Sequence, residues 1–342
     1  LHKAGSIVVM NIENGHILCM ASTPSYNPNK IIQKPNKEYW DSILQNNLSP
    51  LTFRSIQGLY APGSTFKMIV AIAGLYYGVI NTGTNHFCNG KISLGDRLYH
   101  CWKNNGHGSM NVESAIKESC DVFFYEISKK IGIDKIAKVA KDFGLGKVYD
   151  IPLNNQKTGI VPSKKWKKEN LDESWYPGET LISAIGQGFV LTNPLQLATM
   201  TSIIASEGNV VEPKIINDGV SINKKKLEKY KTAIKIIKKA MFKVVNENKG
   251  TAFKSKSNEI VFSGKTGTSQ VRRITVAERE SDDFRKKEVE WNKRDHALFV
   301  GYMPHDNPKF SISVVIEHGG SGASTAAPIA KQVFQFINKS KI

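Results

Sequence analysis

The sequence lacks any long hydrophobic run. Its apolar stretches are much shorter than the roughly 18 consecutive apolar residues of a membrane-spanning helix, so we predict strands and amphipathic helices instead. It also lacks internal repeats and low-complexity linkers. With 342 residues, of which 40% are hydrophobic, the chain is predicted to form one large packed domain with two lobes.

Cysteine is scarce as well. The four cysteines, Cys19, Cys88, Cys101 and Cys120, are too few for a disulfide scaffold in a chain of this length. A signal-peptide pattern is missing, and the chain begins at Leu1 rather than at an initiator methionine. We therefore expect the chain to be a fragment of a longer protein.

Acidic residues are outnumbered by basic ones, which gives a formal net charge of +17. Such a charge is compatible with binding to nucleic acid or to an anionic membrane, or with a lysine-rich composition that has no specific partner. The lysines are mostly scattered, and the densest charged segment, residues 272–295, mixes eight basic with seven acidic side chains. A surface that follows a phosphate backbone would be less mixed, so we predict no nucleic-acid partner.

Strand signals are concentrated at the two ends of the chain. Residues 6–12 and 16–21 are apolar and flank Asn14-Gly15, a pair typical of a tight β-hairpin turn. Residues 297–303 and 310–316 form a second pair of strands, and a further strand is predicted to begin at Ile260. After Ser324, apolar residues recur at helical spacing, which predicts a closing helix against the sheet.

The middle of the chain has mostly helical periodicity. This periodicity extends from about Ser64 to Val245, with helix-boundary residues such as Asp134 and Gly144. We therefore predict an α/β (α+β) fold in which an antiparallel sheet flanked by helices carries an inserted all-helical lobe. The sheet lobe would comprise residues 1–60 and 246–342, and the helical lobe residues 61–245.

Ser64 and Lys67 are the first candidate catalytic pair. They stand in Ala61-Pro-Gly-Ser-Thr-Phe-Lys67, immediately before an apolar run, so they are predicted to share one face of the first turn of a helix. A serine hydroxyl becomes a nucleophile when a base takes its proton, and a lysine whose ammonium form is destabilised can be that base. By itself, however, Ser-x-x-Lys is also common on solvated helix faces.

Two further motifs accompany this pair. Residues 263–268, Ser-Gly-Lys-Thr-Gly-Thr, follow the strand predicted at Ile260, and their glycines would let a ligand approach the backbone. A phosphate-binding loop at Lys265 is excluded because no Gly-x-x-x-x-Gly run precedes it. Residues 119–121, Ser-Cys-Asp, lie between two helical stretches, where ordinary helix residues are the default interpretation.

In this order, the Ser-x-x-Lys, Ser-x-Asp and Lys-Thr-Gly elements resemble those of the penicillin-binding protein and serine β-lactamase superfamily. Residues 61–67, 175–180 and 186–196 are similar to class B transpeptidases, and most similar to the elongation-type penicillin-binding protein 2. The resemblance covers essentially the whole chain and implies a single transpeptidase domain, residues 1–342. It also implies that the membrane helix and pedestal domain of that family lie outside this fragment.

The resemblance implies a role for each motif residue. Ser64 would attack the carbonyl of the penultimate D-Ala of a peptidoglycan stem peptide, and Lys67 would accept its proton. The terminal D-Ala would then leave, and an amine of a second stem peptide would attack the acyl-enzyme. Ser119 would relay a proton to the leaving amine, and backbone N–H groups at Ser64 and Thr268 would stabilise the oxyanion.

The remaining motif residues would bind the donor peptide and set the charge of the site. Its terminal carboxylate would be held by Lys265 and by Thr266, Gly267 and Thr268. Lys265 would also lower the pKa of a neighbouring catalytic lysine. Asp121 stands where asparagine is commonest in the superfamily, so it would add a negative charge.

The same resemblance predicts the surroundings of the protein. Its ligands would be peptidoglycan stem peptides and β-lactam antibiotics, and its partner a membrane glycan polymerase of the shape-determining family, reached through the missing N-terminal region. The domain would lie at the periplasmic face of the bacterial inner membrane. Its chemistry would require no cofactor.

A candidate metal site overlaps the second motif. Cys88, Cys101, His107 and Cys120 offer three thiolates and an imidazole, a donor set typical of a structural zinc site, and some penicillin-binding protein 2 enzymes are similar in carrying zinc there. His86 is an alternative first ligand. The alternative to a metal is a disulfide between Cys88 and Cys101, with Cys120 a buried thiol.

Three other functions compete with a transpeptidase. Ser-Thr-Phe-Lys at residues 64–67 also resembles class D β-lactamases and β-lactam sensor domains, although residues 119–121 fit their Ser-x-Val motif poorly. A basic binding module without catalytic activity and a cytosolic serine amidase are the two others.

Overall fold

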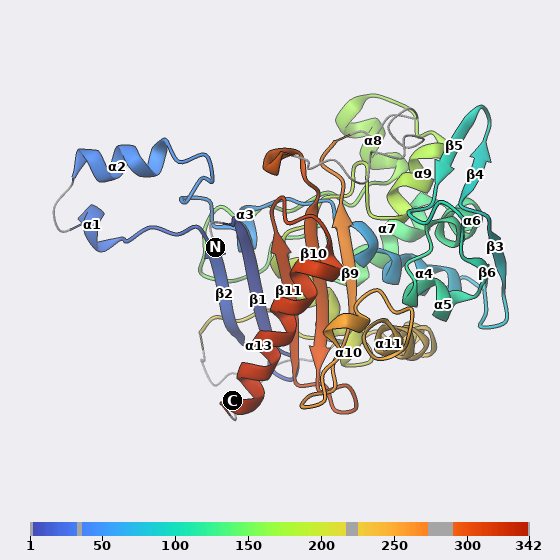
Figure 1. Cartoon of the computed structure of the whole chain (residues 1–342). Coiled ribbons are helices and arrows are strands. Elements are labelled where there is room, and N and C mark those ends of the chain that lie inside the picture. The colour runs from blue at the N-terminus through green and yellow to red at the C-terminus, as the bar shows by residue number, and fades with distance from the viewer. Residues whose placement is uncertain (1–2, 33–35, 217–224, 273–289, 341–342) are drawn as a thin grey trace.

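A five-stranded antiparallel sheet lies at the centre of the molecule (Figure 1). The computed structural model describes residues 3–32, 36–216, 225–272 and 290–340. In the order β2-β1-β11-β10-β9, the sheet joins strands from both ends of the chain, as the sequence predicted. These strands are β1 (Gly5–Asn11), β2 (Ile17–Thr23), β9 (Ser263–Ser269), β10 (His296–Met303) and β11 (Phe310–Ile316).

The predicted opening hairpin is confirmed. Strands β1 and β2 pair through the turn at Asn14 and Gly15, and Asn11 Oδ1 accepts a hydrogen bond from Glu13 N at 2.8 Å. Gly15 has φ +75°, and a Cβ atom there would lie 2.1 Å from the Glu212 carbonyl oxygen. Only glycine combines a favourable positive φ with the absence of a Cβ atom, and its position therefore fixes the register of the hairpin.

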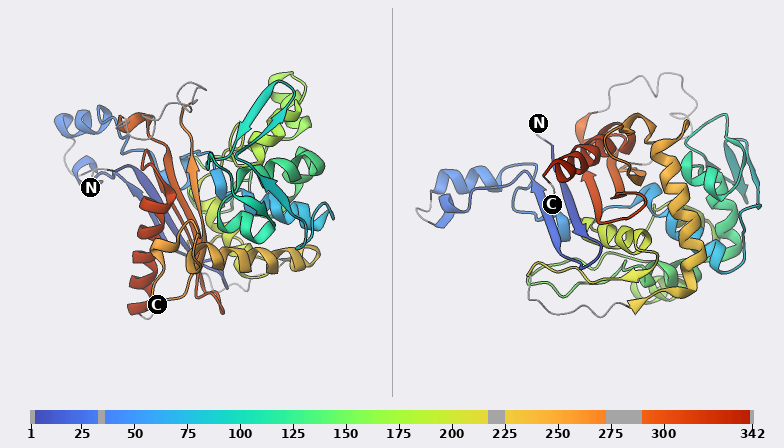
Figure 2. Two further views of the ribbon diagram at one scale, coloured as in Figure 1. Left: turned by 45° about the vertical axis from the view of Figure 1, so that its right-hand side comes forward. Right: turned by 90° about the horizontal axis from the view of Figure 1, so that it is seen from below.

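Helices cover both faces of the sheet. Every residue of β11 is buried, because α10 (Pro194–Ala205) packs on β11 and β1, while α13 (Ala327–Lys339) packs on β10 and β11. The two helices lie on opposite sides of the strands (Figures 1 and 2). The predicted closing helix is therefore confirmed as α13.

The other helices lie mostly beside the β9 edge of the sheet (Figures 1 and 2). At their centre is α4 (Lys67–Tyr76), whose residues from Lys67 to Gly74 are all buried and which contacts α6, α7 and α11. This part of α4 has no solvated face, so Lys67, the first residue of the helix, lies inside the protein. These helices are α5 (Val112–Lys117), α6 (Asp121–Ile131), α7 (Ile133–Asp142), α8 (Lys164–Leu171), α9 (Pro177–Ala184) and α11 (Lys231–Asn246).

Three short helices follow the opening hairpin. Helices α1 (Asn29–Ile32) and α2 (Lys37–Leu44) project from the β2 side of the sheet, and α3 (Arg54–Gln57) returns the chain to it (Figure 1). Within the described residues, no helix is long and apolar enough to cross a membrane.

The structure corrects two details of the prediction. The middle of the chain is not all-helical, because it contains two small two-stranded sheets, β3 (His86–Cys88) with β6 (Gly108–Met110) and β4 (Lys91–Leu94) with β5 (Arg97–His100). Two-residue strands β7 (Asn209–Val210) and β8 (Lys225–Lys226) also pair there. The strand expected at Ile260 begins instead at Ser263. Most of the charged segment 272–295 lies outside the described residues.

Candidate active site

Ser64 lies at a sharp entry into the central helix. A 3₁₀ turn, Gly63–Thr65, precedes α4, and Gly63 has φ +53°. A Cβ atom on Gly63 would lie 2.6 Å from the Thr268 carbonyl oxygen, so only glycine lets this turn approach β9 so closely. The half-buried Ser64 is thereby placed beside the motif that begins at Ser263. The sequence predicted Ser64 on the first turn of the helix, but it lies in the 3₁₀ turn before α4, which begins at Lys67.

Lys67 is fully buried and its ammonium group reaches the second motif. Its Nζ atom donates hydrogen bonds to Ser119 O at 2.9 Å and Ser119 Oγ at 3.2 Å, and forms an ion pair with Asp121 Oδ1 at 2.6 Å. The Phe124 ring lies 5.5 Å from the same atom. Lys67 is therefore held in one position by residues of α6 and by Ser119, which lies just before that helix.

Lys265 approaches the same hydroxyl group from the sheet. This residue of β9 is also fully buried, and its Nζ atom donates to Ser119 Oγ at 3.0 Å and to Thr266 O at 3.1 Å. Ser119 Oγ thus lies within hydrogen-bond distance of two amino groups, one from α4 and one from β9. The three predicted motifs converge on Ser119.

A cavity of about 420 Å³ opens in front of these groups. Its wall includes six of the predicted residues, Ser64, Ser119, Asp121, Thr266, Gly267 and Thr268, while the two lysines lie behind it. A Cβ atom on Gly267 would lie 3.0 Å from Pro62 O, which explains why glycine occupies this point of the strand. The Thr266 hydroxyl is fixed by the Thr251 hydroxyl at 2.7 Å.

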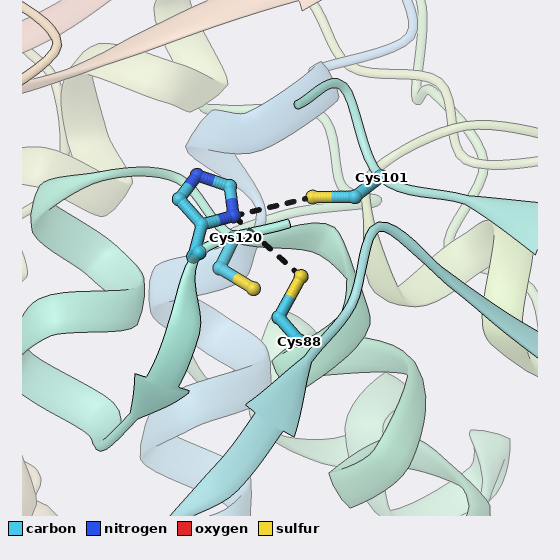
Figure 3. A group of neighbouring side chains, drawn as sticks. Cys88, Cys101 and Cys120 are labelled. Carbon is cyan, nitrogen blue, oxygen red and sulfur yellow. Dashed lines mark hydrogen bonds between the residues drawn. The ribbon is translucent and has the colours of Figure 1, made fainter. Parts of the chain in front are cut away.

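The four predicted metal ligands also converge, and Figure 3 shows the three cysteines of this group, Cys88, Cys101 and Cys120. Their ligand atoms all lie within 4.8 Å of one another, and His107 Nδ1 lies 3.6 Å from Cys88 Sγ and 3.5 Å from Cys101 Sγ. All three cysteines are buried and free, so the alternative disulfide is not formed. His86, the alternative ligand, is not part of this group and packs instead against the Phe123 ring.

The family model for the penicillin-binding protein transpeptidase domain matches residues 5–335 of the chain. The chain belongs to this family. The match spans the whole sheet, all three motifs and the first nine of the thirteen residues of α13, which agrees with the resemblance drawn from the sequence.

The transpeptidase domain is similar to curated proteins named peptidoglycan D,D-transpeptidase MrdA. It is 33% identical to the protein of Haemophilus influenzae, over 99% of this chain and 53% of the relative. It is 34% identical to that of Acinetobacter baumannii, over 98% of this chain and 50% of the relative. The chain therefore spans about half the length of the curated relatives it matches.

Solved structures of penicillin-binding protein 2 have the same fold. A complex of this protein with MreC from Helicobacter pylori matches with a TM-score of 0.89 and 31% identity, over 98% of this chain and 60% of the other. The Pseudomonas aeruginosa protein in complex with WCK 5153 matches with a TM-score of 0.85 and 34% identity, over 97% of this chain and 70% of the other. The predicted resemblance to penicillin-binding protein 2 is confirmed.

The two lysines of the transpeptidase domain have different electrostatic surroundings. Lys67 is paired with the Asp121 carboxylate, whereas Lys265 contacts only the neutral oxygens named above. Burial, together with the positive charge of Lys67, holds the pKa of Lys265 well below its usual value. Burial raises the pKa of Asp121, and the neighbouring Lys67 ammonium opposes this shift.

The chemistry of the cysteine and histidine group fits a zinc ion. Contact with the Cys120 thiol lowers the pKa of Cys101 to about 2, whereas contact with Cys101 and burial raise that of Cys120. Cys101 is therefore favoured as a thiolate and Cys120 is disfavoured, and a divalent cation would remove the penalty on the second thiolate. Three thiolates and one imidazole are a complete tetrahedral set, so such a zinc would be structural.

Sequence reasoning missed several residues that line the cavity. Trp102, Thr251 and Asp295 each come from a different segment of the chain. None stands in a motif, and a hydrogen bond such as the one between Thr251 and Thr266 follows only from the folded chain. Trp102 had one signal, its position next to the candidate ligand Cys101.

Proposed function

We propose that the chain is the catalytic domain of a peptidoglycan D,D-transpeptidase that cross-links stem peptides during cell-wall elongation through an acyl-enzyme on Ser64. The observation that carries the proposal is the shared cavity: Ser64 and Thr268 line it, and two buried lysines meet behind it at Ser119. The names of the curated relatives support the same reaction.

The proposed reaction has two acyl transfers. Lys67 first gives a proton to the paired Asp121 carboxylate. Ser64 Oγ then attacks the carbonyl carbon of the penultimate D-Ala, its proton passes to the Lys67 amine, and the bond to the terminal D-Ala breaks. The leaving nitrogen receives a proton through Ser119. An amine of a second stem peptide then attacks the ester carbonyl, loses a proton, and restores the Ser64 hydroxyl as the new peptide bond forms.

Binding of the donor peptide is assigned to the β9 side of the cavity. Lys265, Thr266 and Thr268 offer an amino group and two hydroxyls to its terminal carboxylate, and Gly267 leaves room for the ligand. Backbone N–H groups of Ser64 and Thr268 would stabilise each oxyanion, an interaction whose loss typically costs about 10²–10³ in rate.

Labelling with a fluorescent penicillin tests the acyl-enzyme. We expect a stable adduct on the unaltered protein, no adduct on Ser64→Ala, and labelling slower by at least about 10²-fold on Lys67→Ala, because the proton acceptor is lost. Ser93→Ala, which removes an exposed hydroxyl of β4, is the matched control and should label normally.

Two outcomes would contradict the assignment. Labelling that persists on Ser64→Ala would place the nucleophile elsewhere. Rapid turnover of the penicillin without a lasting adduct would favour the class D-like β-lactamase. With two stem-peptide substrates, the protein should form a cross-linked product detected by mass spectrometry.

We also propose that Cys88, Cys101, His107 and Cys120 hold a structural zinc. The convergence of four soft or borderline donors supports it. Elemental analysis of protein purified without chelator should give about one zinc per chain, and Cys120→Ser should lose it. Cys19→Ser, a substitution in β2 outside the group, should retain the metal. Metal-free protein with a reducible link between Cys88 and Cys101 would refute the proposal.

The proposed substrate, peptidoglycan, indicates where the full-length protein acts and with which kind of partner. We propose that the full-length protein acts at the periplasmic face of the inner membrane together with a membrane glycan polymerase. The solved complex of penicillin-binding protein 2 with MreC is a precedent for assembly with cell-shape proteins. Co-purification of the full-length protein with the polymerase tests this association, and its absence after chemical cross-linking in cells would contradict it.

A further inference from the structure

Trp102 connects the cysteine and histidine group to the Ser119 motif at three points. It follows the ligand candidate Cys101, and its backbone N–H donates to Asp121 Oδ2 at 2.8 Å. Its indole Nε1–H donates to Ser119 O at 3.0 Å and to Glu118 O at 3.2 Å. One residue outside all three motifs therefore holds both ends of the segment from Ser119 to Asp121.

The backbone conformation of the segment from Ser119 to Asp121 has to be stabilised by its surroundings. Ser119 has φ +58°, a left-handed conformation that costs a non-glycine residue about 1–3 kcal/mol and persists only where its surroundings impose it. Its carbonyl oxygen accepts from two donors, the Lys67 ammonium at 2.9 Å and the Trp102 indole at 3.0 Å. A carbonyl has two lone pairs, so these donors together fix the orientation of the Ser119 peptide group.

The orientation of this peptide group determines where the Ser119 hydroxyl lies. The Cα–Cβ bond of a residue turns with its backbone, and Ser119 Oγ has to reach both Lys67 and Lys265 at 3.2 and 3.0 Å. A rotation that relieved the left-handed conformation would move the hydroxyl away from at least one of them. The indole N–H opposes this rotation as a second donor to the Ser119 carbonyl oxygen, beside Lys67.

Packing in the core does not explain the position of Trp102. Its side chain remains 54% exposed and lines the cavity together with Ser64, while its ring packs edge-on against the His107 ring. A core tryptophan would be buried, and its N–H would need only one acceptor. Here an exposed indole donates to two backbone carbonyls of the loop that carries Ser119.

We propose that Trp102 is a positioning residue for the reaction at Ser64, which acts by holding Ser119 between the two lysines through its indole N–H. The inference rests on the proposed acyl-enzyme function. Trp102 takes no part in bond making, so its loss should slow the acylation step and leave the binding of the ligand nearly unchanged.

Stopped-flow acylation by benzylpenicillin, in competition with a fluorescent penicillin, separates these two effects as the rate constant k2 and the dissociation constant K. In Trp102→Phe the aromatic ring and the backbone N–H remain and only the indole donor is lost. We expect k2 to fall about 10- to 100-fold, because a small displacement of a reacting group costs about that much, with K changed less than about twofold.

A closer isostere isolates the N–H group. Replacement of Trp102 by β-(3-benzothienyl)alanine, which has sulfur in place of the N–H, should lower k2 as much as Trp102→Phe does. Trp40→Phe, which alters a half-exposed tryptophan of α2, is the matched control and should react like the unaltered protein. Melting temperatures and zinc content of all variants should agree.

The measured k2, K and melting temperature distinguish a positioning role of Trp102 from no role and from general structural damage. A native k2 in both Trp102 variants would overturn the inference while leaving the proposed function intact. A fall in k2 accompanied by a weaker K and a lower melting temperature would overturn it too, because general structural damage would then explain the loss. No acylation of the unaltered protein by benzylpenicillin would refute the proposed function, and this inference with it.

Discussion

Lys265 is the residue whose charge is hardest to maintain in the folded protein. Its amino group is buried against Ser119 Oγ and Thr266 O, whereas Lys67 pairs with the Asp121 carboxylate. A buried ammonium group that is not neutralised is unstable, but it gains an opposite charge when a carboxylate ligand binds. The site is thus prepared for an anion rather than for a neutral peptide.

The lowered pKa of Lys265 predicts a pH dependence of binding. Below its folded pKa, Lys265 carries the charge that attracts a carboxylate, and this charge is lost as the pH rises through that pKa. Because burial lowers the pKa from the usual 10.5, the dissociation constant K for benzylpenicillin should begin to rise well below pH 10.5. Stopped-flow measurements between about pH 6 and pH 10 test this prediction. Lys265→Met should bind weakly with no such dependence, and a constant K up to pH 10 in the unaltered protein would contradict the argument.

At the scale of elements, α10 depends on an unusually well-connected start. Asn193 Oδ1 accepts from Gln196 N at 2.9 Å, and Asn193 Nδ2 donates to Lys157 O at 2.9 Å. Gln196 Nε2 donates to Lys147 O and Thr158 O, both at 2.7 Å. The cap of α10 therefore also anchors the connection that leads from α7 to α8.

Asn193→Ala should lower the free energy of unfolding by about 2–4 kcal/mol. It removes a helix cap, worth about 1 kcal/mol, and leaves the Lys157 carbonyl without its donor, which costs about 1–3 kcal/mol more. Asn36→Ala, which removes the exposed cap of α2, should cost at most about 1 kcal/mol. Urea unfolding of both variants measures the difference, and equal losses would contradict the assigned role.

The elements differ in how well the sequence predicts them. The hairpin of β1 and β2 was predictable because Asn14-Gly15 allows few other turns. Strand β9 was misplaced because Ile260 and Phe262 are apolar residues that are buried before the strand begins, whereas β9 itself is made of serine, glycine, lysine and threonine. Pairing with β10 makes this polar segment a strand, and no local propensity indicates that.

At the scale of the whole molecule, the site is assembled from segments far apart in the chain. The motif residues could be predicted because they resemble the motifs of a family. Periodicity alone predicts only ordinary helix or strand residues at these positions. Trp102 and Thr251 could not be predicted, because their importance lies in hydrogen bonds to Ser119 and Thr266 that exist only after folding. The small strands beside Cys88 were missed for the same reason: three or four residues carry too little periodicity.

The net charge of +17 should influence how anionic ligands reach the cavity. A positive molecule raises the local concentration of anions, and salt screens that effect over distances of about 10 Å at 0.1 M ionic strength. We expect k2/K for benzylpenicillin to fall about two- to fivefold between about 0.05 and 0.5 M sodium chloride. Zwitterionic ampicillin should show a smaller change under the same conditions. Identical salt dependence for the two penicillins would exclude steering by net charge.

The contacts of Ser119 Oγ leave only one direction for its hydrogen atom. Amino groups of lysine donate hydrogen bonds, and Lys67 and Lys265 both donate to this oxygen, so both of its lone pairs are occupied. The hydroxyl hydrogen is consequently left for a partner other than the two lysines, and Ser119 lines the cavity that a ligand would enter. A ligand meets Ser119 as an acid rather than as a base, so this hydroxyl can donate to the nitrogen of a tetrahedral intermediate, whose electron pair is no longer shared with a carbonyl group.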